Sequence, residues 1–358
     1  MRILLISYSD VNSGNATIIL NLAKYMSKKF DVDILFDGSK NNNLPDYFKD
    51  LNIRFTPYLK NVYLTLFFGI FYKTIYGMFR RYDIVHAFKP LPTSFIPAFI
   101  ISKIHGSKLF LYFDDWEKAP GLGFRMPFLY EFIDVSIQKS DCVIALTNFL
   151  KNEALKLNKK VVFIPNGANV DFFKPIKSKN KNTIIFIGIL FKTCDVDMVI
   201  RAMKYVKNGK LIVVGDGPRR KEFEDLAKRI GVSNKVEFVG WIDRGKIPEY
   251  INSADIVVMP MKVNLINKSR SPVKLGEYMA CGKAIITSDV GIAKDIIINR
   301  ENGILVSDIK QFGDAINLLL KNKKLRHKLE KNARKTAEKS LDWKIIAGNL
   351  MNAYETVK

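Results

Sequence analysis

The sequence has only three cysteines, Cys142, Cys194 and Cys281, and they are far apart in the chain. The cysteines are odd in number and form no CxxC pair, so neither a disulfide framework nor a zinc site is indicated. A reducing compartment is therefore expected, and the predicted location is the cytoplasm. The inner face of the cell membrane is an alternative within it.

Long apolar runs are also missing. The first residues, MRILLISYSD, have only a short apolar run after Arg2, which is too short for the core of a signal peptide and is typical of a buried strand. The longest strongly apolar stretch, Val62 to Tyr72, falls well short of the roughly 18–20 residues that a membrane span needs. No transmembrane helix is predicted.

Acidic residues are scarce relative to basic ones. The chain has 35 of the former and 57 of the latter, which gives a formal net charge of +22. Such an excess favours anionic partners such as phosphorylated metabolites or membrane surfaces, although lysines spread over solvated helix faces would give the same balance. Nucleic acid is not expected, because the lysines are dispersed and no RRM, KH or zinc pattern is present.

What the chain does have is an alternation of short apolar runs with helical patterns such as Thr17–Lys28 and Asn148–Leu157. Runs rich in Val, Ile, Leu and Phe are typical of parallel strands covered on both faces, and the alternation indicates repeated βαβ units. The predicted strands are Ile3–Ser7, Val32–Phe36, Ile84–Ala87, Leu109–Phe113, Cys142–Leu146, Val161–Ile164, Thr183–Ile187, Lys210–Val214, Lys235–Val239, Ile256–Met259, Ala284–Thr287 and Gly303–Val306.

These strands fall into two groups, so the predicted fold is α/β with two doubly wound, Rossmann-like domains. A polar, basic stretch, KPIKSKNKN at 174–182, is the predicted linker between a first domain at 1–173 and a second at 183–340. The last residues, 341–358, have the pattern of an amphipathic helix.

A glycine turn follows one of the predicted strands. In VVGDGP, residues 213–218, the strand leads into Gly215 and Gly217, and a helical pattern comes next. Glycines here let backbone amides approach a phosphate or nucleotide, and the N-terminus of the next helix adds partial positive charge. An ordinary turn between a strand and a helix fits the pattern equally well.

A second motif, SPVKLGEYMACG at 271–282, predicts a helix with Ser271 as N-cap, Pro272 in the first turn and Gly282 as the stop. Its free amides at Val273 and Lys274, with the Lys274 ammonium, would suit a diphosphate.

Glu277 lies further along this predicted helix. A carboxylate there could accept two hydrogen bonds from ribose hydroxyls. A salt bridge between Glu277 and a surface lysine is the alternative.

Taken together, the motifs resemble the retaining family 4 glycosyltransferases. The C-terminal half is similar through GDGP, VEFVGWIDRGKIPEYINSADIVVMP (236–260), EYMACGKAIITSDVG and NGILV (302–306). SGNATIILNLAK (13–24) resembles the family's N-terminal glycine loop, and PNGANVDFFKP (165–175) resembles its crossover between domains. The final DWKIIAGNLMNAYE resembles the family's last helix, which returns to the N-terminal domain.

The resemblance implies a GT-B fold, in which two Rossmann-like domains face each other across a cleft. It also implies a nucleotide-sugar donor, a glycan or lipid-linked acceptor, retained anomeric configuration, and neither a metal nor another cofactor. The donor-binding residues that it implies are Gly14 and Asn15 in the first domain, the turns at Gly188 and Gly215, Trp241 and Ile242 beside the base, and Glu277 at the ribose.

The chain departs from the family at several basic and acidic positions. Ser269 replaces the first of two glutamates, Pro272 removes a backbone amide of the phosphate turn, and Ile189 and Cys194 replace an arginine and a lysine. We infer that the missing positive charge could come from Lys192, Arg270 and Lys274 instead.

Metal binding is not expected. The two Asp-x-Asp pairs, Asp31 with Asp33 and Asp195 with Asp197, stand at the start of a predicted strand and where a helix should begin. Amides and basic side chains are the remaining route for stabilising the leaving diphosphate.

Two residues are candidates for activating the acceptor. Asp114, followed by Asp115, comes directly after the strand KLFLYF, at the carboxyl edge where such sheets bind ligands. His86 ends the strand DIVHA and is the second candidate, with a satisfied strand-end histidine as its alternative interpretation.

Residues 61–81 predict either a core helix or a helix lying on an anionic membrane. The apolar residues at helical spacing are Leu64, Phe67, Phe68, Phe71, Ile75 and Phe79, and those expected at the interface are Tyr72, Lys73, Tyr76, Arg80 and Arg81.

Two other functions fit the sequence. A sugar-nucleotide epimerase would share the architecture, and a catalytically silent nucleotide-sugar-binding subunit would fit the altered acidic and basic positions.

Overall fold

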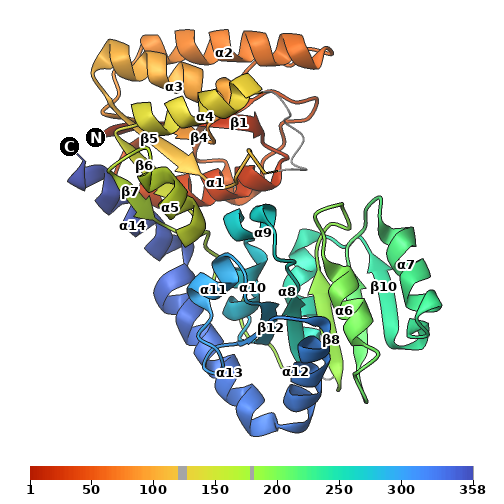
Figure 1. Cartoon of the computed structure of the whole chain (residues 1–358). Coiled ribbons are helices and arrows are strands. Elements are labelled where there is room, and N and C mark those ends of the chain that lie inside the picture. The colour runs from red at the N-terminus through yellow and green to blue at the C-terminus, as the bar shows by residue number, and fades with distance from the viewer. Residues whose placement is uncertain (120–126, 178–180, 358) are drawn as a thin grey trace. The chain divides into compact units, whose positions relative to one another are not determined.

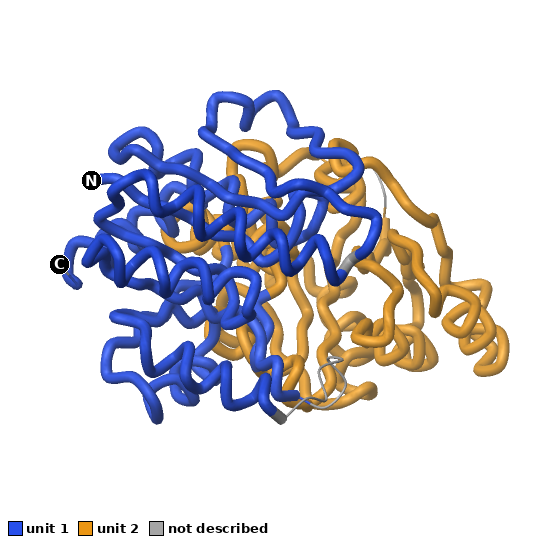
Figure 2. Tube along the Cα trace, turned by 90° about the horizontal axis from the view of Figure 1, so that it is seen from above, with its two compact units in different colours: residues 1–166, 269–271, 343–358 blue, residues 167–268, 272–342 orange. Residues whose placement is uncertain are grey.

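The computed structural model describes residues 1–119, 127–177 and 181–357. The chain forms two compact units (Figure 2). Unit 1 contains residues 1–166, 269–271 and 343–358, and unit 2 contains residues 167–268 and 272–342. Part of the predicted linker, 178–180, lies outside the described residues.

Unit 1 is a parallel sheet of seven strands in the order β3-β2-β1-β4-β5-β6-β7. The strands are β1 (Arg2–Asp10), β2 (Asp31–Asp37), β3 (Asn52–Phe55), β4 (Ile84–Phe88), β5 (Lys108–Phe113), β6 (Cys142–Ala145) and β7 (Val161–Phe163). The helices are α1 (Gly14–Met26), α2 (Val62–Met78), α3 (Pro92–His105), α4 (Pro127–Lys139), α5 (Asn148–Leu155) and α14 (Trp343–Thr356), with a 3-10 turn at Asp46–Phe48.

Helices cover both faces of this sheet (Figure 1). Helix α3 packs on β1 and β4, and α2 packs on α3 at the outside of the unit. Helix α1 packs on β1 and β2, and α14 packs on α1. A sheet covered in this way explains the near-continuous apolar runs of the inner strands, because both of their faces are buried.

Unit 2 is a parallel sheet of six strands in the order β10-β9-β8-β11-β12-β13. The strands are β8 (Thr183–Ile187), β9 (Lys210–Val214), β10 (Val236–Gly240), β11 (Ile256–Met259), β12 (Ala284–Ser288) and β13 (Ile304–Val306). The helices are α6 (Val196–Ala202), α7 (Arg220–Arg229), α8 (Ile247–Ser253), α9 (Leu265–Ser269), α10 (Lys274–Ala280), α11 (Ile292–Ile296), α12 (Ile309–Lys321) and α13 (Lys323–Thr336), with 3-10 turns at Ser233–Lys235 and Arg244–Lys246 and a π turn at Ala337–Leu341.

Both sheets are doubly wound, so the predicted fold class of two Rossmann-like domains is confirmed. The division of the chain falls after Asn166, earlier than residue 173. Residues just beyond it belong to unit 2 because the Ala168 amide donates to the Leu341 carbonyl at 2.7 Å. A side chain at Gly276 would lie 3.2 Å from the Ala168 methyl, so the segment that follows Asn166 is also closely packed against α10.

The helix predicted to begin at Ser271 begins later, which corrects the prediction. Helix α10 starts at Lys274, and Val273 is at its N-cap without a side-chain hydrogen bond. The Ser271 hydroxyl accepts instead from the Asn166 backbone amide at 3.3 Å, and the Asn166 side-chain amide donates to the Ser271 carbonyl at 2.6 Å. The predicted stop at Gly282 is confirmed, with a left-handed φ of 61°.

Among the described residues, no helix has both the length and the apolar character needed to cross a bilayer.

Candidate active site

In unit 2, two glycine turns lie against each other at the carboxyl edge of the sheet. Gly188 follows β8 and its amide donates to the Val214 carbonyl at 3.0 Å, and the Gly215 amide donates to Gly240 at 2.8 Å. A side chain at Gly215 would lie 2.1 Å from the Gly188 carbonyl oxygen, and the φ of Gly215 is +124°. Only glycine fits there, so bare backbone lines this edge, where parallel sheets bind ligands.

The ammonium of Lys274 reaches the same turns from α10. Its Nζ donates to the Ile187 carbonyl at 2.9 Å. It would lie 2.6 Å from a methyl group placed on Gly188 and is 4.9 Å from the centre of the Phe186 ring. A fixed positive charge therefore stands directly beside the glycine backbone, as a diphosphate site requires.

Glu277 lies on the same helix and is buried at 7% exposure. Its Oε1 accepts from the Arg244 guanidinium at 3.1 Å. Burial raises the pKa of Glu277, while the charges of Arg244 and Lys274 act to lower it. The partner is thus a half-exposed arginine rather than the surface lysine considered from the sequence, and the carboxylate is held in place by it.

The loop that supplies Arg244 also carries the residues expected beside the nucleotide base. Trp241 follows β10 with 73% of its surface exposed, and Ile242 is half-buried. Arg244 itself was missed by the sequence analysis, because a single arginine in a polar loop carries no local signal. An exposed indole is available for stacking on a planar ring.

The loop at 189–194 lacks the family's basic residues, but the guanidinium of Arg219, from another segment, contacts it. Arg219 donates to the Cys194 carbonyl at 3.2 Å and pairs with Glu222 at 2.6 Å. Lys192 is exposed in this loop, and Ile189 is 62% exposed. Arg219 was also missed, although it directly follows the GDGP turn.

Four other predicted donor residues lie in unit 1 or at its boundary. Gly14 opens α1 and is exposed, with Ser13 as the N-cap that accepts from the Ala16 amide at 3.3 Å. Asn15 is half-buried. Arg270 is half-buried and Ser271 is buried, and both are grouped with unit 1, so their pairing with Lys274 and their role at the donor remain predictions.

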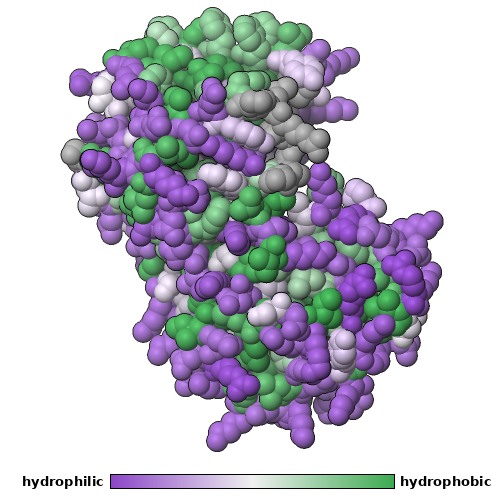
Figure 3. Space-filling view, in the orientation of Figure 1, coloured by the Kyte–Doolittle hydropathy of each residue, from purple (hydrophilic) through white to green (hydrophobic). Residues whose placement is uncertain are grey.

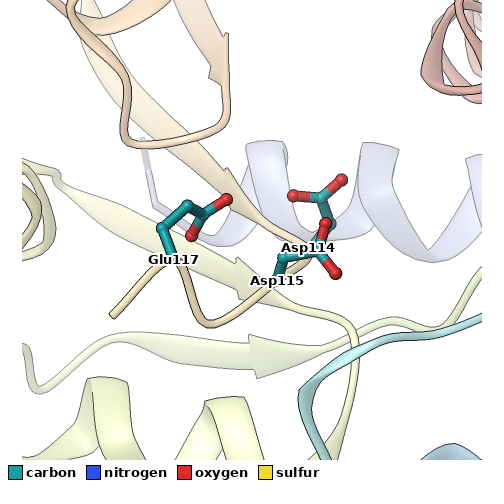
Figure 4. Close-up of side chains that lie close together, drawn as sticks. All are labelled: Asp114, Asp115 and Glu117. Carbon is teal, nitrogen blue, oxygen red and sulfur yellow. The ribbon is translucent and has the colours of Figure 1, made fainter. Parts of the chain in front are cut away.

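Asp114 lies in a cluster of charged side chains at the carboxyl ends of β4 and β5 (Figure 4). The Lys89 ammonium is 2.7 Å from Asp115 Oδ2, 3.0 Å from Glu117 Oε1 and 3.4 Å from Asp114 Oδ1. Lys89, Asp114 and Glu117 are each more than nine-tenths buried. Lys89 and Glu117 were missed by the sequence analysis, because nothing local links the lysine of HAFKP to an acid turn further along the chain.

This cluster is buried and carries more negative than positive charge, and both features raise the pKa of Asp114 and Glu117. Burial raises the pKa of Asp114 to about 8, with Lys89 opposing the shift and the neighbouring carboxylates adding to it. Burial also raises the pKa of Glu117. Burial by itself would lower the pKa of Lys89, but the three carboxylates hold it well above its ordinary value, so the lysine stays charged.

The position of Asp114 suits a proton acceptor. Lys89 donates hydrogen bonds to Asp115 and Glu117, whereas Asp114 Oδ1 makes only a longer ion-pair contact of 3.4 Å with the same ammonium. A carboxylate with a raised pKa can take the proton of a hydroxyl brought against it.

Three carboxylates this close could also hold a metal ion. The Lys89 ammonium, however, already stands within hydrogen-bonding or ion-pair distance of all three. A divalent ion would have to displace a buried cation, so the donor set fits the lysine better than a metal.

His86 does not fit the role of an acceptor-activating base. Its side chain is completely buried in β4, its Nδ1 is 2.6 Å from the Tyr354 hydroxyl of α14, and its ring stacks on Phe88 at 4.8 Å. Burial lowers its pKa to about 3. We therefore assign His86 to core packing, the alternative interpretation of the sequence, because a substrate cannot reach it.

Both Asp-x-Asp pairs have partners within the protein. Asp33 is buried and accepts from the Tyr82 hydroxyl at 2.7 Å, while Asp31 pairs with Arg2 at 2.6 Å. Asp195 accepts from the Asn267 side chain at 2.7 Å, and Asp197 lies 3.0 Å from the Lys262 ammonium.

Two Rossmann-like units with bare glycine turns at a sheet edge are the architecture found in GT-B glycosyltransferases. A family model described as "Glycosyltransferase Family 4" matches residues 12–172, and one described as "Glycosyl transferases group 1" matches residues 168–336. The chain belongs to the family 4 glycosyltransferases and is an enzyme of that class.

Relatives support this assignment. An uncharacterized glycosyltransferase of Methanocaldococcus jannaschii is 26% identical over 310 residues, which is 77% of this chain and 75% of the relative. An N,N'-diacetylbacillosaminyl-diphospho-undecaprenol alpha-1,3-N-acetylgalactosaminyltransferase of Campylobacter jejuni is 29% identical over 254 residues, 64% of this chain and 61% of the relative. The structure of Anabaena HepE in complex with UDP is similar with a TM-score of 0.80 and 18% identity over 99% of this chain and 100% of HepE, a likeness of fold.

Proposed function

We propose that this glycosyltransferase moves a sugar from a nucleotide-sugar to a glycan or lipid-linked acceptor, without a metal and with retention of anomeric configuration. The observation that carries the proposal is the convergence of Gly188, Gly215, Lys274 and Glu277 at one edge of the unit 2 sheet. Backbone and a cation would meet the diphosphate there, and a buried carboxylate would meet the ribose.

The chemistry calls for positive charge at the leaving group. Transfer of the glycosyl group leaves a nucleoside diphosphate with additional negative charge, which must be stabilised as it develops. Lys274 is preorganised for this by its bond to the Ile187 carbonyl. Lys192 and Arg270 are further sources, and Arg219 would steady the loop that carries Lys192. No Asp-x-Asp pair is needed in this arrangement.

The names of relatives and neighbours support the proposed substrate class. HepE was solved in complex with UDP, and also with UDP-glucose. The Campylobacter jejuni relative is named for transfer to a diphospho-undecaprenol-linked sugar. We infer a nucleoside diphosphate sugar as donor and a lipid-linked or free glycan as acceptor, with Asp114 accepting the proton of the attacking hydroxyl.

A lipid-linked acceptor would place the enzyme at the inner face of the cell membrane. We propose such a peripheral contact as the site of action.

The proposal is tested by incubating the protein with UDP-, GDP-, ADP- and dTDP-sugars in EDTA and measuring release of the nucleoside diphosphate. Slow hydrolysis of at least one donor is expected without metal, and proton NMR should show that the sugar is first released in the donor's anomeric configuration. Activity that disappears in EDTA and returns only with Mg²⁺ or Mn²⁺ would contradict the metal-free proposal. Inversion would contradict retention.

Lys274→Ala should weaken binding of the nucleoside diphosphate by about 10-fold or more, because a charged hydrogen bond contributes roughly 1.5–3 kcal/mol. Affinity for the bare nucleoside should be nearly unchanged. Titration calorimetry with both ligands measures the difference, and Lys268→Ala, an exposed lysine on α9, is the control. Equal losses for the two ligands would show that Lys274 does not contact the phosphates.

A further inference from the structure

Helix α2 is oriented with the side chain of Lys73 facing the interior of unit 1. Lys73 is completely buried, its ammonium is 2.5 Å from Asp37 Oδ1, and it donates to the Ser7 carbonyl at 2.7 Å. This corrects the expectation that Lys73 lies at an interface. A buried ion pair breaks only at a large cost, so it fixes which side of α2 faces unit 1.

The opposite side of α2 is apolar and exposed. Tyr63 is 79% exposed, Phe67 69%, Phe71 61% and Phe79, just after the helix, 85%. Leu64, Leu66, Phe68, Ile75 and Met78 are exposed as well. Figure 3 shows the resulting hydrophobic surface over α2. A helix that buries a lysine and exposes phenylalanines is not a core helix, so the structure contradicts that interpretation of residues 61–81.

The same surface continues onto the neighbouring helix. Ile100 and Ile104 of α3, which packs against α2, are 37% and 50% exposed. An apolar surface of this extent, contributed by two adjacent helices, marks an interaction site rather than scattered exposed residues. We call the exposed apolar residues of α2, with Phe79, Ile100 and Ile104, the α2 face.

Charge around the α2 face identifies the partner. Residues 51–113 contain a single acidic residue, Asp83. Exposed basic residues accompany the face at Lys60, Arg81 and Lys103. A second copy of the chain would bring the same positive charges together, which is unfavourable, whereas an anionic lipid surface is complementary both to the aromatics and to the cations.

We propose that the α2 face inserts into the headgroup region of an anionic bilayer, with Lys60, Arg81 and Lys103 against the lipid phosphates. The helix has 17 residues and lies in the interface rather than crossing it. In the free protein, the ion pair between Lys73 and Asp37 keeps the aromatic side chains on the other side of α2 exposed. The α2 face names the residues of the membrane contact that is proposed above. Its lipid binding does not depend on glycosyl transfer, because it requires no donor.

Co-sedimentation of the purified protein with phosphatidylcholine vesicles, with and without phosphatidylglycerol, tests the proposal. Binding should require phosphatidylglycerol and should decrease as salt increases, because exposed charges are screened. Phe67→Ser with Phe71→Ser should reduce the vesicle partition coefficient at least about 10-fold, since two apolar side chains leave the interface. Arg81→Gln should reduce it about fivefold, corresponding to about 1 kcal/mol per basic residue.

Phe128→Ser is the matched control, because Phe128 of α4 is 63% exposed and lies outside the α2 face. This variant should bind vesicles like the wild type, and thermal unfolding should show that all variants are folded. No binding to anionic vesicles at low salt would overturn the proposal, as would equal losses in Phe128→Ser. Sedimentation velocity showing a dimer that the Phe67 and Phe71 changes dissociate would instead assign the face to a second copy. Nucleoside diphosphate affinity, measured in the same samples, keeps a failed membrane contact distinct from a failed donor site.

Discussion

Asp114→Asn is expected to lower turnover by about 10²- to 10⁴-fold, the range that a positioned general base contributes. The amide keeps the shape of the side chain but cannot take a proton. Affinity for the nucleotide-sugar should stay nearly unchanged, because Asp114 lies in unit 1 and the residues that converge at the sheet edge lie in unit 2. Single-turnover rates and donor titrations separate the two effects.

The pH dependence provides an independent check on Asp114. Its pKa is raised to about 8, and only the ionised carboxylate can accept a proton, so turnover should rise with pH through this range. Asp115→Asn removes a like charge that helps to raise this pKa, so the rise in turnover should move to lower pH.

Asp46→Asn is the control, because Asp46 is exposed and pairs with Lys49 at the surface, and it should leave the profile unchanged. A folded Asp114→Asn variant that loses donor affinity while retaining its turnover rate would remove Asp114 from the chemistry.

Most strands were predictable because they are compact apolar runs, and the central ones have both faces buried. β12 (Ala284–Ser288), for example, is buried at every position. β3 (Asn52–Phe55) was missed because it is an edge strand with only partly buried and exposed residues, so its sequence, NIRF, carries no continuous apolar signal. The start of α10 was mispredicted because Ser before Pro is typical of a helix N-cap. The Ser271 hydroxyl instead accepts a hydrogen bond from Asn166, which is distant in the chain.

The candidate site shows the same division between local and distant information. Gly215 and Glu277 stand in contiguous motifs, so their chemistry could be inferred from neighbouring residues. Lys89 and Arg244 act through partners far along the chain, Asp114 and Glu277 respectively, and only the fold brings each pair together. His86 was overestimated because burial under α14, contributed by the last residues of the chain, is invisible in the sequence DIVHA.

Glu277→Gln is expected to weaken nucleotide-sugar binding roughly 10- to 100-fold, since hydrogen bonds to a charged group contribute about 1.5–3 kcal/mol. The carboxylate is buried and can accept from two ribose hydroxyls, whereas an amide offers one acceptor oxygen. Glu338→Gln is the matched control, because Glu338 also pairs with an arginine, Arg334 at 2.7 Å, and stands in another part of unit 2. Glu338→Gln should leave donor affinity unchanged.

Titration calorimetry of the preferred nucleoside diphosphate in EDTA, comparing the wild type, Glu277→Gln and Glu338→Gln, tests most directly whether the unit 2 edge is a metal-free donor site. Tight binding by the wild type and the control, with the 10- to 100-fold loss confined to Glu277→Gln, is the predicted result. Full affinity in a folded Glu277→Gln variant, or wild-type binding that appears only when a divalent ion is added, would contradict the account.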